Sequence, residues 1–221
     1  MDSALLAQLV FYGLAAAVAA PAAAVVSAVI LSKSNRAIVG ALVFTAGALL
    51  LDVVIVVVVL ASGAFDDGGD AGAYLDVLLG VLFALLGVFA IFQTEDPEKE
   101  AARRARVDSI AVAKLATLFV AGIAVQMINF DAIAVMSGGL KEIARADIGT
   151  GDEAVATLFL LALMLIPYYV PAVMYAISPQ RAGKLLSGMT EWIVSNSRRV
   201  EIVTGLAFGA LFLWKGLAVL V

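Results

Sequence analysis

The sequence predicts an all-α integral membrane protein with six transmembrane helices, and three observations support this. Hydrophobic residues make up 63% of the 221 residues and charged residues only 14%, with a mean hydropathy of +1.07. A soluble domain is nearer half apolar and a quarter charged, so one water-soluble core cannot bury this much apolar surface. The apolar residues fall into six long stretches, and the basic residues concentrate in alternate connections between them.

A helix needs about 20 residues to cross the hydrocarbon core of a bilayer. The six stretches that qualify lie at residues 4–31, 37–63, 73–93, 112–136, 153–177 and 199–221. The first stretch has no Lys or Arg ahead of it, whereas a secretory signal normally begins with basic residues. We therefore interpret it as the first span.

The Lys and Arg residues orient the predicted bundle, because cytoplasmic loops carry an excess of them. The first, third and fifth connections hold ten of these residues and the other two connections hold two. The ten are Lys33, Arg36, Lys99, Arg103, Arg104, Arg106, Arg181, Lys184, Arg198 and Arg199, and the two are Lys141 and Arg145. This bias predicts that both termini lie outside and that the first, third and fifth connections lie in the cytoplasm.

Six spans divide into two halves of three, and a duplicated half with an odd number of spans must insert upside down. We predict a first repeat at residues 1–93, a cytoplasmic linker at 94–111 and a second repeat at 112–221. AAPAAAVVSAVI of the first span resembles INFDAIAVMSGG of the fourth, and LLGVLFALLGVF of the third resembles VTGLAFGALFLW of the sixth. Within the second repeat, apolar residues share one face of an amphipathic helix at about 179–198, which we expect to lie in the inner interface.

Prolines predict breaks in two spans. Pro21 removes a backbone donor from the first span, and Pro167 and Pro171 do the same in IPYYVP of the fifth. Transporters built from inverted repeats place substrate at such breaks, where freed backbone groups face a cavity. Tyr168 and Tyr169 lie between the two prolines and offer hydroxyl groups to that cavity.

The fourth span contains an unusually polar stretch, VQMINFDAIAV, with Gln126, Asn129 and Asp131. Asn129 and Asp131 are about 200° apart on a regular helix, so both face one site only if the helix unwinds. Asp52 near the centre of the second span has no sequence-near partner. A charge within the membrane costs about 2.5–3.5 kcal/mol even on lenient scales, so these residues are candidates for a substrate path.

Lys215 lies in the outer part of the sixth span, at a predicted depth comparable with that of Asp131. We predict an ion pair between Lys215 and Asp131, with Lys215–Asp76 as the second choice. Buried polar links that only hold helices together are the alternative interpretation of these residues.

The chain has no Cys and no His. Thiol chemistry, disulfides and the usual zinc and copper sites are therefore excluded. No P-loop of the G-x-x-x-x-G-K-[ST] type is present, so an ATPase motor is not expected either. We predict a protein that is not an enzyme and that needs no cofactor or metal.

Several stretches resemble a known family. These are SKSNRA leading into GALVFTAGALLLD, then VQMINFDAIAVMSGG, and then IPYYVPAVMYAISPQRAGKLLSGMTEWIVSNSRRVEIVTGLAFGALFLWKG. They resemble the peptidoglycolipid-addressing proteins, a group similar to the sulfolipid-addressing proteins of mycobacteria within the lysine-exporter superfamily. The superfamily often has a polar residue beside the proline of span one, but here Ala20 and Ala22 flank Pro21.

The resemblance implies a six-span protein of the bacterial cytoplasmic (inner) membrane that exports or positions envelope lipids as a homodimer. Its expected partners are membrane lipids and a cytoplasmic or envelope-biosynthesis protein, with no nucleic acid. Two alternatives stay open: a small-solute exporter for a cation or amino acid that uses Asp52 and Asp131, and a membrane scaffold that transports nothing.

Overall fold

The computed structural model describes residues 2–61, 70–92, 101, 105, 109 and 113–220. The described residues form ten helices and no strand, which confirms the all-α prediction. The first half holds α1 (Ser3–Val18), α2 (Pro21–Lys33), α3 (Ala37–Ala61) and α4 (Asp70–Phe92). The second half holds α6 (Leu115–Ile128), α7 (Phe130–Arg145), α8 (Thr150–Met164), α9 (Ile166–Ile177), α10 (Pro179–Ser195) and α11 (Ser197–Leu220). The predicted linker at 94–111 lies almost entirely outside the described residues.

Three bent helix pairs take up much of the bundle. α1 and α2 meet at 63°, α6 and α7 at 74°, and α8 and α9 at 68°. Pro21 is the first residue of α2 and Pro167 the second of α9, positions at which a helix needs no donor from the proline nitrogen. Pro171 lies inside α9. The bend at Asn129 has no proline, and the Asn129 side chain does not cap α7.

By length and composition, two helices reach across a membrane on their own, at Ala37–Val59 and Arg198–Ala218. The number of candidate membrane spans among the described residues rises to five when each bent pair is taken as one span. The described apolar part of α4, Asp76–Phe92, is shorter than a full span. A further difference concerns the predicted outer loop after residue 136, because α7 continues as a helix to Arg145.

Glycines let two pairs of helices approach closely. A Cβ added to Gly47 of α3 would lie 2.0 Å from the Phe119 carbonyl oxygen, and one added to Gly122 of α6 would lie 2.0 Å from that of Phe44. α3 and α6 therefore cross with their backbones in contact, one turn before the polar residues Asp52 and Gln126. Crossings of this kind are typical of membrane helices, which associate through small residues.

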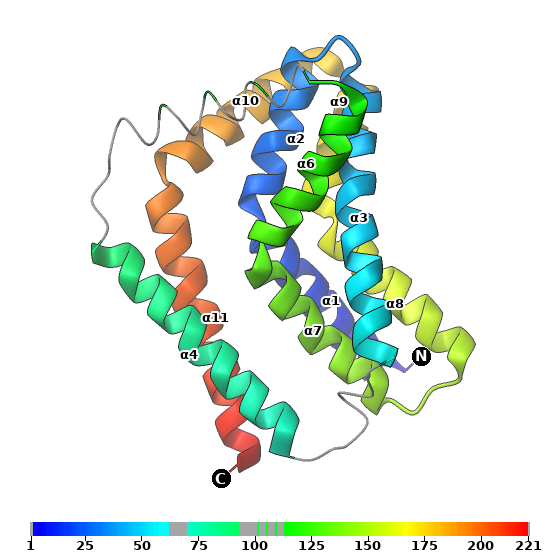
Figure 1. Cartoon of the computed structure of the whole chain (residues 1–221), viewed down its shortest axis with the longest axis vertical. Coiled ribbons are helices and arrows are strands. Elements are labelled where there is room, and N and C mark those ends of the chain that lie inside the picture. The colour runs from blue at the N-terminus through cyan, green and yellow to red at the C-terminus, as the bar shows by residue number, and fades with distance from the viewer. Residues whose placement is uncertain are drawn as a thin grey trace.

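α4 and α11 form a second tightly packed pair through the same device. A Cβ on Gly205 would lie 2.7 Å from the Gly87 Cα, and one on Gly209 would lie 2.7 Å from the Ala84 nitrogen. Among the helices that the structure describes, α4 packs extensively only against α11. Figure 1 shows this pair leaning away from the rest of the bundle.

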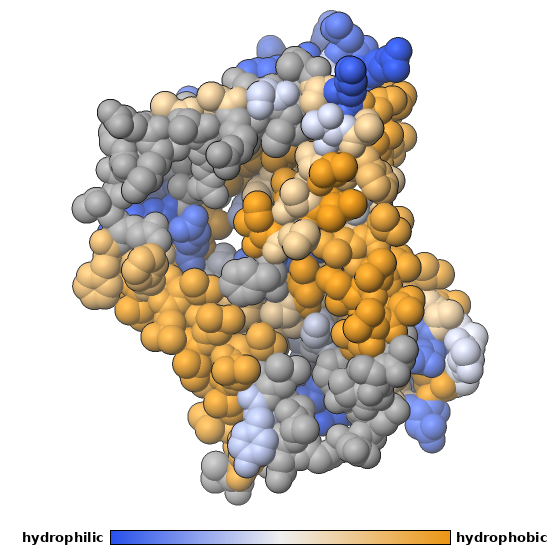
Figure 2. Space-filling model, in the orientation of Figure 1, coloured by the Kyte–Doolittle hydropathy of each residue, from blue (hydrophilic) through white to orange (hydrophobic). Residues whose placement is uncertain are grey.

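Most of the surface is apolar. Figure 2 shows hydrophobic side chains over α3, α4 and α6, and exposed residues on these helices include Leu50, Val58, Leu85 and Phe89. α10 crosses the end of the bundle at which α2 and α3 are joined, and both chain termini lie toward the other end (Figure 1). This exposed apolar surface and the apolar helices indicate a protein that is embedded in a membrane.

Candidate functional site

Four buried polar side chains from separate elements meet inside the bundle, and we call them the polar cluster. Asp52 comes from α3, Gln126 from α6, Asn129 from the bend before α7, and Tyr168 from the first turn of α9. Asp52, Gln126 and Tyr168 are fully buried, and Asn129 is 5% exposed. All four residues were predicted from the sequence as candidates for the substrate path, but no sequence pattern indicates that they lie together.

The polar cluster is a chain of hydrogen bonds. Asn129 Nδ2 donates to the Tyr168 hydroxyl at 3.3 Å, and that hydroxyl donates to Gln126 Oε1 at 2.5 Å. Gln126 Nε2 then donates to Asp52 Oδ1 at 2.7 Å. Because the Gln126 amide donates at one end and accepts at the other, its orientation is determined by its two neighbours.

Tyr168 is also held from two other directions. The Ser27 hydroxyl of α2 donates to the Tyr168 carbonyl oxygen at 2.7 Å. The Tyr168 ring stacks on Phe44 of α3 with 5.3 Å between ring centroids. Tyr168 therefore contacts α2, α3 and α6, so a movement of α9 changes its contacts with all three helices.

Asp52 is the least satisfied member of the polar cluster. Its Oδ1 accepts from Gln126, but its Oδ2 is buried and has no hydrogen-bond partner among the described residues. A buried ionised carboxylate with a single neutral donor is strongly destabilised relative to water. Oδ2 can therefore bind a proton or accept a hydrogen bond from a positively charged group.

Asp131 and Tyr169, the other predicted residues of the substrate path, lie within two residues of a cluster member along the chain but are not part of the hydrogen-bond chain described above. Asp131 is half-buried in the first turn of α7, where its Oδ1 accepts from the Ala132 backbone nitrogen at 3.0 Å. Carboxylates are stabilised at that position by the helix dipole and free N–H groups. The bend at Asn129 separates the two residues: Asn129 joins the hydrogen-bond chain and Asp131 begins the next helix. Tyr169 is half-buried and packs against the apolar core.

A second set of charged side chains joins the α4–α11 pair to the bundle. Lys141 of α7 donates to Asp76 of α4 at 2.9 Å, and both side chains are less than 10% exposed. Lys215 of α11 donates to Glu142 of α7 at 2.8 Å and also to the Tyr12 hydroxyl of α1. We call these five residues the charge latch.

The predicted pairing of Lys215 with Asp131 or Asp76 was therefore wrong. The sequence interpretation ended the fourth span at residue 136 and so left Lys141 and Glu142 in a solvated loop. Because α7 continues as a helix to Arg145, it instead carries these adjacent residues into contact with α4 and α11. The helical spacing of the apolar residues Met136, Leu140 and Ile143 around these charges was the signal for a continued helix.

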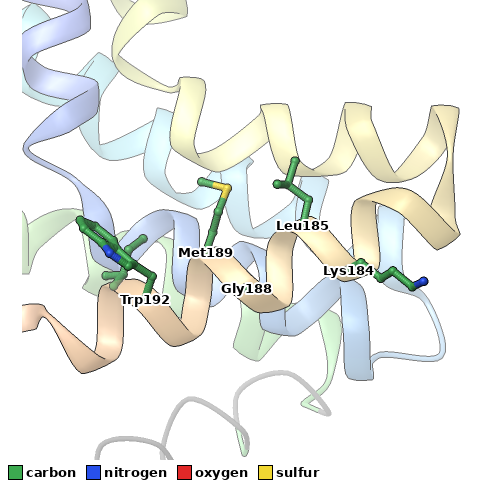
Figure 3. A pocket seen from close by; sticks show the side chains of 6 residues that line it. Lys184, Leu185, Gly188, Met189 and Trp192 are labelled. Atoms are coloured by element: carbon green, nitrogen blue, oxygen red, sulfur yellow. The ribbon is translucent and has the colours of Figure 1, made fainter.

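α10 corresponds to the predicted amphipathic helix at about 179–198. It carries a shallow groove of about 380 Å³, lined by Lys184, Leu185, Gly188, Met189, Trp192 and Ile193. Figure 3 shows Leu185 and Met189 pointing to the same side of α10, with Lys184 and Trp192 toward its two ends. Trp192 is 60% exposed, so the groove presents apolar surface beside a basic residue.

Comparisons with known proteins give one result. No curated protein and no solved structure matches the chain. A model of the family described as "Sap, sulfolipid-1-addressing protein" matches residues 9–218, which is nearly the whole chain. The bent, apolar, all-helical bundle thus belongs to a member of the sulfolipid-1-addressing protein family.

Proposed function

We propose that this protein is a secondary transporter or export factor for an amphiphilic cell-envelope lipid with a polar, glycolipid-like headgroup. The observation that carries the proposal is the polar cluster, which lies where the α6–α7 and α8–α9 bends meet. Discontinuous helices of this kind mark the substrate sites of transporters. The family name adds support, since it refers to the addressing of a sulfolipid.

An amphiphile has two parts, and the molecule offers a surface suited to each. Hydroxyl and amide groups such as those of Tyr168, Asn129 and Gln126 suit a sugar-like headgroup once the bends separate. The exposed apolar surfaces of α3 and α4 suit acyl chains that stay in the bilayer. The groove on α10 combines an exposed Trp192 with Lys184, as expected of a helix that lies among lipid headgroups.

The proposal includes an arrangement in the membrane. Six spans form two inverted three-helix repeats in the bacterial cytoplasmic membrane, with both termini outside, and the protein acts as a homodimer of the lysine-exporter type. Two features support the repeats: Ala20 precedes α2 and Asn129 precedes α7 at corresponding bends, and α4 packs against α11, its counterpart. The basic residues of α10 and of the α2–α3 turn support the orientation.

Native mass spectrometry of the gently solubilised protein tests the proposal, with extraction and identification of the lipids that co-purify. We expect one defined amphiphile in stoichiometric amount, lost in Asn129→Ala and Tyr168→Phe but kept in Glu201→Gln, a substitution at an exposed position of α11. Bulk phospholipid that is unchanged by the cluster substitutions contradicts lipid export. A defined lipid that all variants retain indicates a scaffold that binds lipid elsewhere.

A small-solute exporter for a cation or amino acid is the second candidate. One observation favours it: Asp52 Oδ2 has no partner in the described part of the chain and suits a positively charged group. Export of a radiolabelled basic amino acid from proteoliposomes, abolished by Asp52→Asn, is the result that supports this candidate over lipid export.

A further inference from the structure

We infer that Asp52 is a proton-binding site, and that it takes up and releases the proton which couples transport to the membrane's proton gradient. The inference rests on the proposed transport function but concerns the energy source, which the family name does not address. Three properties of Asp52 carry it: complete burial, one satisfied and one unsatisfied oxygen, and a hydrogen-bond chain that ends on it.

Complete burial favours a neutral Asp52 in this conformation. An ionised carboxylate loses far more solvation on burial than a single amide donor returns, and buried acids usually neutralise instead. Gln126 Nε2 donates one hydrogen bond to Oδ1, and no Lys or Arg pairs with Asp52 in the described residues. A proton on Oδ2 removes the charge and leaves the bond to Oδ1 intact.

The surroundings favour a proton over a metal cation. α6 carries no acidic or basic residue, α2 carries only Lys33 at its end, and no group of three or more acidic side chains gathers to hold a metal anywhere in the described residues. The titratable group that α9 contributes to the polar cluster is Tyr168, and the acidic residue of α7 nearest to it along the chain is Asp131, two residues after Asn129. A dehydrated cation needs more oxygen ligands than one carboxylate supplies.

The hydrogen-bond chain links the charge of Asp52 to the bends. Loss of the proton leaves a carboxylate that needs more donors, and Asn129, Tyr168 and Gln126 are the polar groups within the chain. A change in their hydrogen bonding acts directly on the α6–α7 bend and on α9. In the balanced step, Asp52 binds one proton from water on one side of the membrane and returns it to water on the other side.

Infrared difference spectroscopy of the full-length protein in proteoliposomes tests this inference without any lipid substrate. We expect a protonated-carboxyl C=O band that disappears as the pH is raised and is absent in Asp52→Asn. Asn keeps the oxygen that accepts from Gln126, so that variant is expected to fold. Asp131→Asn is the matched control and should retain the band, whereas Tyr168→Phe should shift its titration midpoint, because the donor to Gln126 is lost.

Two results overturn the inference. In the first, the wild-type band persists in Asp52→Asn or no band titrates. In the second, replacing N-methylglucamine with sodium changes the proton concentration at the titration midpoint tenfold. Such a change indicates that Asp52 belongs to a cation site. The lipid-identification experiment is independent of these outcomes. If the Asp52 band titrates but no defined lipid co-purifies, lipid export alone is refuted. If a defined lipid co-purifies but no band of Asp52 titrates, proton coupling alone is refuted.

Discussion

The charge latch provides the sharpest test of how the α4–α11 pair is attached to the bundle. Lys141 and Asp76 are 2.9 Å apart with side chains that are 5% and 8% exposed. At that distance two unit charges attract by about 6 kcal/mol for an effective dielectric constant of about 20. This attraction offsets the desolvation of both groups, so loss of one partner leaves the other buried and uncompensated. We expect Lys141→Met and Asp76→Leu each to lower the free energy of unfolding by about 3–5 kcal/mol.

The double variant separates this reasoning from simple loss of packing. Replacing both charges with apolar side chains removes the desolvation cost together with the attraction, so we expect its stability to lie within about 1 kcal/mol of wild type or above it. The assay is unfolding in mixed micelles with rising sodium dodecyl sulfate, followed by circular dichroism. Single variants within about 0.5 kcal/mol of wild type, or a double variant whose loss equals the sum of the two, refute the argument.

Three further predictions use the same unfolding assay. Gly122→Ala drives a Cβ into the Phe44 carbonyl and should lower the free energy of unfolding by about 1–3 kcal/mol. The control Gly188→Ala, whose added Cβ has nothing within 4 Å, should leave that free energy unchanged or raise it. Equal effects of the two substitutions contradict the close crossing of α3 and α6. Tyr168→Phe leaves the buried Gln126 oxygen without its donor and should cost about 1–3 kcal/mol; a neutral effect shows that the polar cluster repacks. Lys215→Met should cost only about 1 kcal/mol or less, because the Lys215 side chain is 30% exposed; a loss as large as that of Lys141→Met contradicts this ranking.

Composition and proline positions predicted much of the fold. The apolar stretches gave the helical, membrane-embedded class, and Pro21 and Pro167 mark two of the three bends. The third bend, at Asn129, was signalled only by the polar character of VQMINFDAIAV, because no proline stands there. A polar residue at a bend leaves a weaker pattern than a proline, since its effect depends on partners from other helices.

The candidate site was predicted as a set of residues but not as an arrangement. Asp52 and Gln126 are neighbours because Gly47 and Gly122 bring α3 and α6 into backbone contact, which no local pattern reveals. The ion pairs were missed for a related reason. Pairing depends on where α7 ends in space, and a sequence window that stopped at residue 136 removed Lys141 and Glu142 from consideration.

The composition of the charge latch has a consequence for the response to voltage. Lys141 and Glu142 are adjacent on α7 and hold an acid of α4 and a base of α11. A displacement of the α4–α11 pair relative to α7 therefore moves Asp76 and Lys215 together, and their charges cancel. The membrane potential does work on net charge alone, at about 2.3 kcal/mol per elementary charge for each 100 mV. The joint movement of Asp76 and Lys215 is thus electrically silent, and a response of this helix pair to voltage requires its other charged residues.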